Sequence, residues 1–152
     1  MDAIQLLKTD HDAVKKMLEA GEKTTERGVK TRQALLTRIK EELTVHEIIE
    51  EEIFYPALKE HPKAREIVLE GYEEHHVVDM IMAELEQTPF EDETWGAKFT
   101  VMKENIEHHI EEEETEMFKQ ARQVLDAQEL RDLGARMEER KRQAKAELAP
   151  AG

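Results

Sequence analysis

The chain has 152 residues, of which 39% are hydrophobic and 38% are charged, and it carries a formal net charge of −14 at pH 7. This length suits a single domain with a hydrophobic core, whereas the acidic composition disfavours nucleic-acid phosphate and anionic membranes as partners. The absence of cysteine excludes disulfide bonds, thiolate zinc sites and iron–sulfur clusters.

The first predicted element is a helix at residues 3–22, with Asp2 as its N-cap. Its core stripe recurs every three or four residues and comprises Ile4, Leu7, His11, Val14 and Leu18. A second helix repeats this spacing and ends at a break near residues 60–63, where Pro62 stands. Its stripe comprises Leu36, Ile39, Leu43, His46, Glu50, Ile53 and Ala57.

The third predicted helix has two candidate registers because His75 and His76 are adjacent. The favoured register directs His75 to the core and comprises Val68, Tyr72, His75, Val78 or Asp79, Met82 and Leu85. The alternative, which would bury Glu73 and Gln87, comprises Leu69, Glu73, His76, Met80, Ala83 and Gln87. The favoured register leaves His76 near an edge.

A break at residues 88–92 precedes the fourth helix, for which Asp92 or Thr94 is the expected N-cap. Its stripe comprises Trp95, Phe99, Met102, Ile106, His109, Glu113, Met117 and Val124. Asp126 with Glu129 indicates a new helix start. We therefore expect a bundle at residues 1–125 and, at residues 126–152, a C-terminal helix and charged tail packed on it through Leu130, Leu133 and Met137. Residues 149–152 are expected to form a frayed end.

Four helices with short connections predict an all-α, up-down-up-down antiparallel four-helix bundle with a short extra C-terminal helix. At the rise of an α-helix, the polar residues of the stripes fall between about 12 and about 22 Å along the bundle axis. They form one layer: His11, His46, Glu50, His75, His109 and Glu113. Two of the helices carry a His four residues before a Glu, which places both side chains on one face.

Metal binding explains this layer better than structural histidines do. A single core histidine is usually satisfied by a neighbour, but buried carboxylates are costly unless a cation balances them. We therefore predict that all six residues of the layer are metal ligands. The surrounding acids are expected to form solvated helix faces: Glu51, Glu52, Glu111, Glu112 and Glu114.

The ligand types favour iron. Six nitrogen and oxygen ligands exceed what one tetrahedral zinc ion requires, and imidazole disfavours calcium and magnesium. Imidazole with carboxylate suits non-haem iron or manganese, and two His–Glu helices suggest two ions bridged by Glu50 and Glu113. Each ion would receive about two imidazoles, which leaves positions for oxo, hydroxo, water, dioxygen or peroxide.

The sequence resembles the hemerythrin-like family, the HHE cation-binding domain, over about residues 1–125. The resemblance rests on Asp10-His11, His46-Glu47 with Glu50-Glu51 and Tyr55-Pro56, Glu74-His75, and His109 with Glu112-Glu113 and Phe118. It implies a four-helix bundle with a non-haem di-iron centre in its middle.

Two departures from the family's oxygen carriers accompany this resemblance. Those proteins have a second His four residues after the first on the third helix, where this chain has Asp79, and HxxxxD on the last helix instead of HxxxE. The resemblance therefore points to the H-HxxxE-H-HxxxE type and away from reversible oxygen storage. Tyr72 is a candidate extra ligand or hydrogen-bond donor, or a packed aromatic; whether His76 or Asp79 also joins the ligands stays open.

We expect a protein that binds or reacts with O₂, H₂O₂ or NO at two oxo- or hydroxo-bridged iron ions, with manganese or zinc less favoured. A catalase-like, peroxidase-like or NO-handling enzyme and an iron, oxygen or redox sensor without turnover both use these ligands, and a purely structural bundle is a third interpretation. The N-terminus lacks a signal stretch and no apolar run approaches the ~20 residues of a membrane span, so we expect a cytoplasmic protein. The sequence indicates no particular protein partner.

Overall fold

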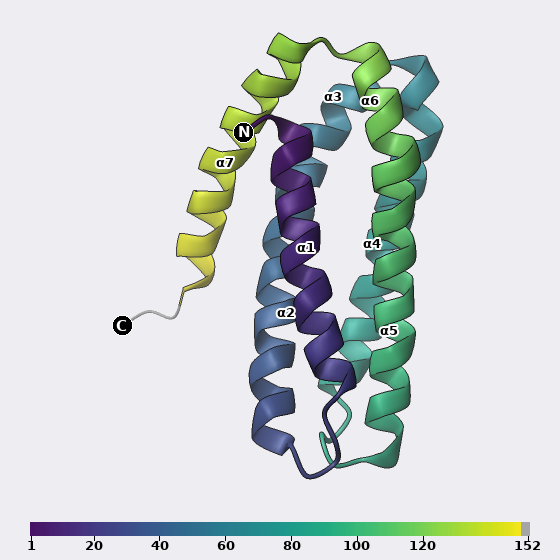
Figure 1. Cartoon of the computed structure of the whole chain (residues 1–152), viewed down its shortest axis with the longest axis vertical. Helices are drawn as coiled ribbons and strands as arrows, with labels where there is room; N and C mark the ends of the chain where they lie inside the picture. Colours follow the sequence, from purple (N-terminus) through teal and green to yellow (C-terminus); the bar gives the residue numbers. More distant parts are fainter. Residues whose placement is uncertain (150–152) are drawn as a thin grey trace.

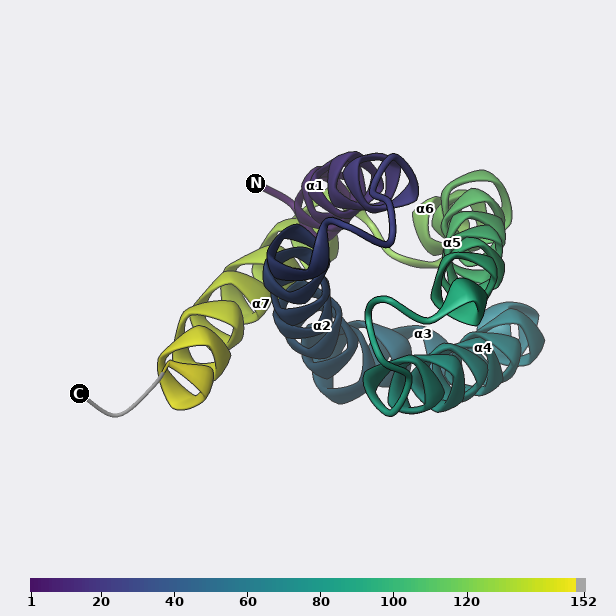
Figure 2. The same cartoon turned by 90° about the horizontal axis from the view of Figure 1, so that it is seen from below.

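The computed structural model describes residues 1–149, and within them it is an antiparallel bundle of four long helices with a fifth helix outside it (Figure 1). This confirms the predicted fold class. The bundle helices are α1 (Ala3–Glu22), α2 (Val29–Ile49), α4 (Pro62–Glu86) and α5 (Glu93–Glu112). Seen along its axis, the bundle has these four helices around a common centre, with α7 (Ala127–Leu148) lying against one side (Figure 2).

Local signals set the helix ends. α1 and α7 begin with capping boxes, in which the side chain of Asp2 or Asp126 accepts from the backbone three residues later. Asp92, and not Thr94, caps α5 and accepts from the backbone N–H of Thr94. Pro62 occupies the first position of α4, where its missing N–H costs no helical hydrogen bond.

The second and fourth bundle helices each contain a π-helical turn that the sequence pattern did not reveal. These turns are η1 (Glu50–Phe54) and η2 (Glu113–Met117), and each begins at a predicted metal ligand. The chain then continues as α3 (Tyr55–Lys59) and α6 (Phe118–Val124). A π-turn accommodates one extra residue, so the buried stripe moves by one position beyond it.

The shift corrects two predicted core positions. Ala57 and Val124 were expected on the stripe but are only partly buried, whereas the next residue in each case, Leu58 or Leu125, is buried. An unbroken period of 3.6 residues was assumed, and that assumption fails at an inserted residue.

A polar layer divides the hydrophobic core into two clusters. One cluster lies at the end where α3, α6 and the start of α1 meet, and Phe54, Tyr55 and Phe118 are its largest fully buried members. The other surrounds Trp95 and Phe99 at the opposite end. The six predicted ligands lie between these clusters and are all buried.

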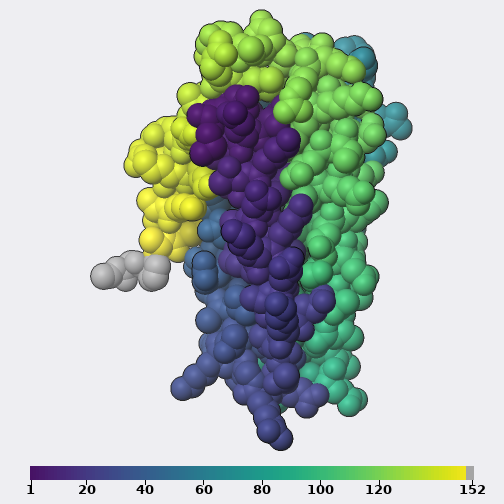
Figure 3. Space-filling view, viewed as in Figure 1, coloured from purple at the N-terminus to yellow at the C-terminus, as the bar shows by residue number. Residues whose placement is uncertain are grey.

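The C-terminal helix is longer than the short helix expected, because its charged second half also contacts the bundle. α7 packs against α1, α2 and η1, and the space-filling view shows it directly beside α1 (Figure 3). The predicted contacts Leu130, Leu133 and Met137 are buried, and so is Ala144 near the far end. Of the expected frayed end, Ala149 follows the helix, and residues 150–152 lie outside the described residues.

None of the helices in residues 1–149 combines the length and the apolar composition that a membrane span requires.

Gly134 should be needed where α7 meets the N-terminus. A methyl group at this position would collide with backbone atoms of Met1, Asp2 and Ala3, which cannot move aside as a flexible side chain can. We expect Gly134→Ala to lower the free energy of unfolding by about 1–3 kcal/mol, measured by urea denaturation.

Gly96→Ala is the matched control, because the nearest atom to its added methyl group is Arg32 Nη2 at 3.9 Å. The better helix propensity of alanine should make this variant neutral or slightly more stable. Equal stabilities for the two variants would contradict the assigned packing of α7.

Candidate metal centre

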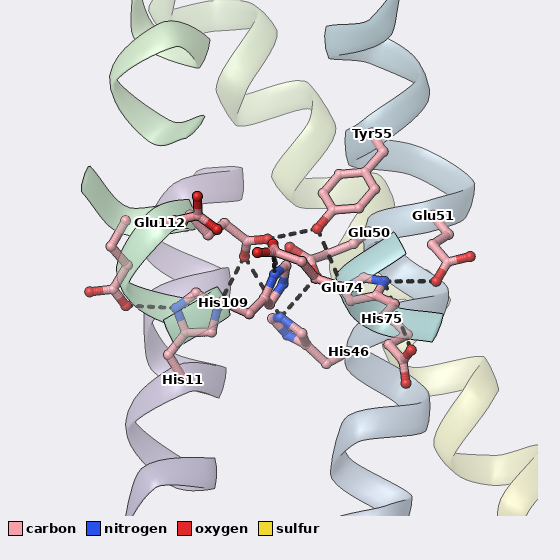
Figure 4. Close-up of polar contacts among 12 residues, drawn as sticks. His11, His46, Glu50, Glu51, Tyr55, Glu74, His75, His109 and Glu112 are labelled. Atoms are coloured by element: carbon pink, nitrogen blue, oxygen red, sulfur yellow. Dashed lines mark hydrogen bonds and ion pairs between the residues drawn. The ribbon is translucent and has the colours of Figure 1, made fainter. Parts of the chain in front are cut away.

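The six predicted ligands come together in one layer of the core from all four bundle helices. Figure 4 shows this layer and labels each of them except Glu113. None of their six side chains is more than 9% exposed. Single histidines come from α1 and α4, and a His–Glu pair comes from each of α2–η1 and α5–η2. The structure thus brings together the complete predicted set: His11, His46, Glu50, His75, His109 and Glu113.

Each central carboxylate lies between two imidazoles of different helices. Glu50 Oε1 is 3.1 Å from His46 Nε2 and 3.1 Å from His75 Nε2. On the other side, the two oxygens of Glu113 divide their contacts: Oε1 is 3.0 Å from His11 Nε2, and Oε2 is 3.2 Å from His109 Nε2.

These contacts form two overlapping groups of potential ligand atoms. Within each group the atoms lie within 4.8 Å of one another: His11, His46 and Glu113 in the first, and Glu50, His75, His109 and Glu113 in the second. Glu113 belongs to both groups. A carboxylate with one oxygen toward each group is the arrangement expected of a bridge between two cations.

Three buried atoms of the layer lack hydrogen-bond partners, and this matches a metal site. They are His46 Nε2, His109 Nε2 and Glu50 Oε2. The two imidazole nitrogens lie close to carboxylate oxygens but are not aligned with them as hydrogen bonds. Unsatisfied buried polar atoms are rare in proteins, and a cation would satisfy all three. The nitrogen and oxygen donors present therefore fit a bound transition metal.

A ring of four outer acids fixes the orientation of the four imidazoles. Every Nδ1 contacts a carboxylate: His11 with Glu114 at 2.6 Å, His46 with Asp10 at 3.0 Å, His75 with Glu51 at 2.7 Å, and His109 with Glu74 at 2.7 Å. An acceptor on Nδ1 places the proton there and leaves Nε2 free to bind a metal. All four Nε2 atoms accordingly face the centre.

The outer acids correct the prediction that Glu51 and Glu114 belong to solvated faces. Each follows a central glutamate directly, so Glu50–Glu51 holds both ring nitrogens of His75, and Glu113–Glu114 holds both of His11. Periodicity sorts residues into core and surface, but a residue beside the core stripe can still reach a neighbouring helix.

The remaining acids of the predicted faces are not central ligands. Glu52 pairs with Arg140 of α7, and Glu111 is exposed. Glu112 lies near His108 and Glu74 at the surface.

The tyrosine at the centre is Tyr55 and not Tyr72. The Tyr55 hydroxyl donates to Glu113 Oε2 at 2.8 Å and lies 3.4 Å from His75 Nε2. Tyr72 packs against Tyr55, and its hydroxyl faces the backbone of Glu51. The π-turn carries Tyr55 into the core, a position that a regular helix would not have predicted. His76 and Asp79 are exposed and stand outside the six.

A small apolar cavity lies directly against the histidine rings. Its volume is about 30 Å³. Its lining includes the four histidines and, from the cluster around Trp95 and Phe99, Val14, Val78, Ile106 and Ile110. That space can hold a molecule of only a few atoms, and its walls offer almost no polar surface.

In the absence of a cation, protons balance the charge of the layer. Burial alone lowers the pKa of His109, but the adjacent Glu113 raises it to about 10. Burial likewise lowers the pKa of His75, and hydrogen bonds to Glu50 and Glu51 raise it to about 9. The pKa of Glu113 is held well below its usual range, because the surrounding hydrogen bonds and imidazolium charge outweigh its burial. A cation that binds here must therefore displace imidazole protons.

The hemerythrin HHE cation-binding domain model matches residues 2–121. A similar solved structure is the crystal structure of a hemerythrin HHE cation-binding domain-containing protein from Mycobacterium kansasii, which is 26% identical to this chain. The match covers 97% of this chain and 89% of that one, with a TM-score of 0.86. The comparison with curated proteins found no match. The chain therefore belongs to the hemerythrin HHE cation-binding domain family, as the sequence motifs indicated, and is a metal-binding module.

The metal-stripped protein should lose stability as the pH rises from 7 to 10. Because the folded-state pKa values of His75 and His109 lie above the ordinary value of 6.5, their contribution to stability is fully present below pH 6.5. It is lost as the pH rises through about 9 and about 10. We expect the melting temperature of chelator-treated protein, followed by circular dichroism, to fall across this range.

The variant His109→Gln removes one of these titrating groups, so its melting temperature should fall less between pH 7 and 10. A melting temperature that stays constant between pH 7 and 10 in the parent protein would show that protons do not balance the buried carboxylates.

Proposed function

We propose that this member of the hemerythrin HHE family holds two iron ions in its central layer and reacts there with a small oxidant, O₂, H₂O₂ or NO. The observation that carries the proposal is the position of Glu113 between two groups of donor atoms beside a cavity of about 30 Å³. The proposal has two parts, the identity and number of the ions and the size of the ligand.

Two ions account for the donor set better than one. The four imidazoles separate into a pair from α1 and α2 and a pair from α4 and α5, and Glu113 contacts both pairs through different oxygens. A single six-coordinate ion would need all six donors in one group, whereas their atoms form two groups. Imidazoles together with two carboxylates suit iron, whose ferric state is stabilised by negative ligands.

The cavity supports a small, weakly polar ligand. Its volume is too small for an organic substrate, and its apolar walls offer a water molecule few hydrogen-bond partners. Bound iron would supply Lewis acidity and redox electrons. The chain supplies a small apolar space beside the four oriented imidazoles.

Tyr55 supports the bridging position of Glu113. The hydroxyl donates to Glu113 Oε2, and burial together with the nearby carboxylates raises the pKa of Tyr55 well above 10, so it stays protonated at neutral pH. A permanent donor on this oxygen keeps the carboxylate turned toward both imidazole pairs.

A sensor without turnover remains the second candidate, and the origin of the ligands favours it. Because they come from all four bundle helices, metal binding ties the whole bundle together, and its loss would loosen the fold. Peroxide consumption by iron-loaded protein distinguishes the two: an enzyme consumes more peroxide than free iron does, and a sensor does not.

The stoichiometry of iron tests the ion pair. Purified protein loaded with ferrous iron without oxygen should contain two irons per chain by elemental analysis. His75→Gln should lose one of them, because the imidazole faces the centre. His76→Gln is the matched control one residue away and should keep both, because His76 is exposed. One zinc, or one iron that both variants retain, would sink the di-iron proposal.

Filling the cavity should slow the reaction without removing the metal. Val78 lines the cavity, and its neighbour Val77 is exposed. We expect Val78→Leu to keep two irons and to reduce the rate of peroxide consumption, or of NO binding followed optically, by roughly 10-fold or more, since one methylene in a tight pocket has effects of this size. Val77→Leu should react as the parent does. Equal rates for both variants would place the reaction elsewhere.

A further inference from the structure

The four outer acids are not equivalent, and Asp10 differs from the other three. Only 5% of its side chain is exposed, whereas the side chains of Glu51, Glu74 and Glu114 are between 26% and 39% exposed. Asp10 is buried at the side of the bundle where α7 packs against α1 and α2. The environment of the Asp10–His46 pair is therefore set partly by α7.

A lysine of α7 completes this environment. Lys141 Nζ lies 2.5 Å from Asp10 Oδ1, and the other oxygen of Asp10 contacts His46 Nδ1 at 3.0 Å. Lys141, Asp10 and His46 thus form a continuous line from the C-terminal helix to the metal centre. Among the described residues, no lysine or arginine pairs with Glu51, Glu74 or Glu114.

The ammonium group of Lys141 has a predictable effect on His46. An acid partner increases the electron density that an imidazole offers to a metal. An ammonium group on the same carboxylate withdraws part of that negative charge, and burial makes the effect larger than it would be in water. His46 should therefore be a weaker electron donor to a bound metal than His109, whose partner Glu74 has no lysine or arginine beside it.

We propose that Lys141 is a positioning residue that makes the two metal positions unequal: acting through Asp10, it weakens the binding of the ion held by His11, His46 and Glu113. This inference rests on the proposed two-metal centre. Lys141 lies outside residues 2–121, the segment that the family model matches, so the effect comes from the C-terminal helix α7. One ion would then exchange more readily than the other.

Other contacts hold α7 in place without Lys141. Arg140 forms a two-pronged pair with Glu52, at 2.9 and 3.2 Å, and Met137 and Ala144 are buried on either side. Lys141→Gln should therefore leave α7 docked. The amide can still donate to Asp10, so this substitution removes the charge while keeping a hydrogen-bond donor.

The test measures the stepwise binding of ferrous iron by calorimetry without oxygen. The parent protein should show two steps. In Lys141→Gln, the affinity of one step should rise about 10-fold, which is the size of effect that hydrogen-bond partners of metal ligands have. The affinity of the other step should stay within twofold of the parent value. Lys141→Arg keeps the charge and should retain the parent affinities. In a His11→Gln background, which removes the weaker position, Lys141→Gln should have no effect.

Lys145→Gln is the matched control, because it removes the same charge one turn further along α7, where Lys145 is half exposed and 3.9 Å from Glu42. Both of its binding steps should equal those of the parent. Parent protein that binds no second ion would defeat the proposed function itself. Three results would overturn the role of Lys141 while leaving the two-metal centre intact, provided that the parent shows two normal steps. They are unchanged affinities in Lys141→Gln, a weakened step in Lys141→Gln, or the same tightening in Lys145→Gln.

Discussion

The structure depends on one constraint: two carboxylates and four imidazoles share the middle of an otherwise apolar core. Glu50 and Glu113 are essentially inaccessible to water, so their charge must be balanced from within the protein. Protons on the surrounding imidazoles can balance it, as the raised pKa values of His75 and His109 indicate, and a bound cation can replace those protons. The same residues thus give the fold two alternative ways of reaching neutrality, and the choice between them depends on pH and on metal.

The polar layer is built by repeating one arrangement twice. In each half, an acid that precedes a single histidine contacts the histidine of the next helix: Asp10 contacts His46, and Glu74 contacts His109. In return, the paired glutamates that begin each π-turn hold a single histidine of another helix by both ring nitrogens. Each bundle helix therefore supplies a carboxylate to the histidine of one neighbouring helix, and its own histidine contacts a carboxylate from the other neighbour. The fifth helix makes the two halves unequal, because Lys141 of α7 reaches Asp10 in one of them.

Much of the layer could be predicted from the sequence because its members lie on regular helical stripes. His11, His46, Glu50, His75, His109 and Glu113 keep the same phase as the apolar core, and the caps at Asp2 and Asp126 define helix ends locally. The outer acids were not predictable in this way, because whether Glu51 reaches His75 depends on how two helices face each other. The role of Tyr55 depends on the inserted residue of η1, which no short-range pattern specified. The full length of α7 likewise follows from contacts between its charged second half and the bundle, such as the Arg140–Glu52 pair and the buried Ala144.

The two sides of the layer have different properties, and this limits what each can contribute to a reaction. The cavity opens among Val14, Val78, Ile106 and Ile110, in the cluster around Trp95, whereas Tyr55 belongs to the opposite cluster. A ligand in the cavity is therefore separated from the Tyr55 hydroxyl by the layer of imidazoles and carboxylates itself. Tyr55 can influence such a ligand only indirectly, through Glu113, to which its hydroxyl donates, and through His75, on which its ring stacks. The polar contacts around the six central residues thus come from behind them, from Tyr55 on one side and from Asp10 with Lys141 on another, while the cavity side is apolar.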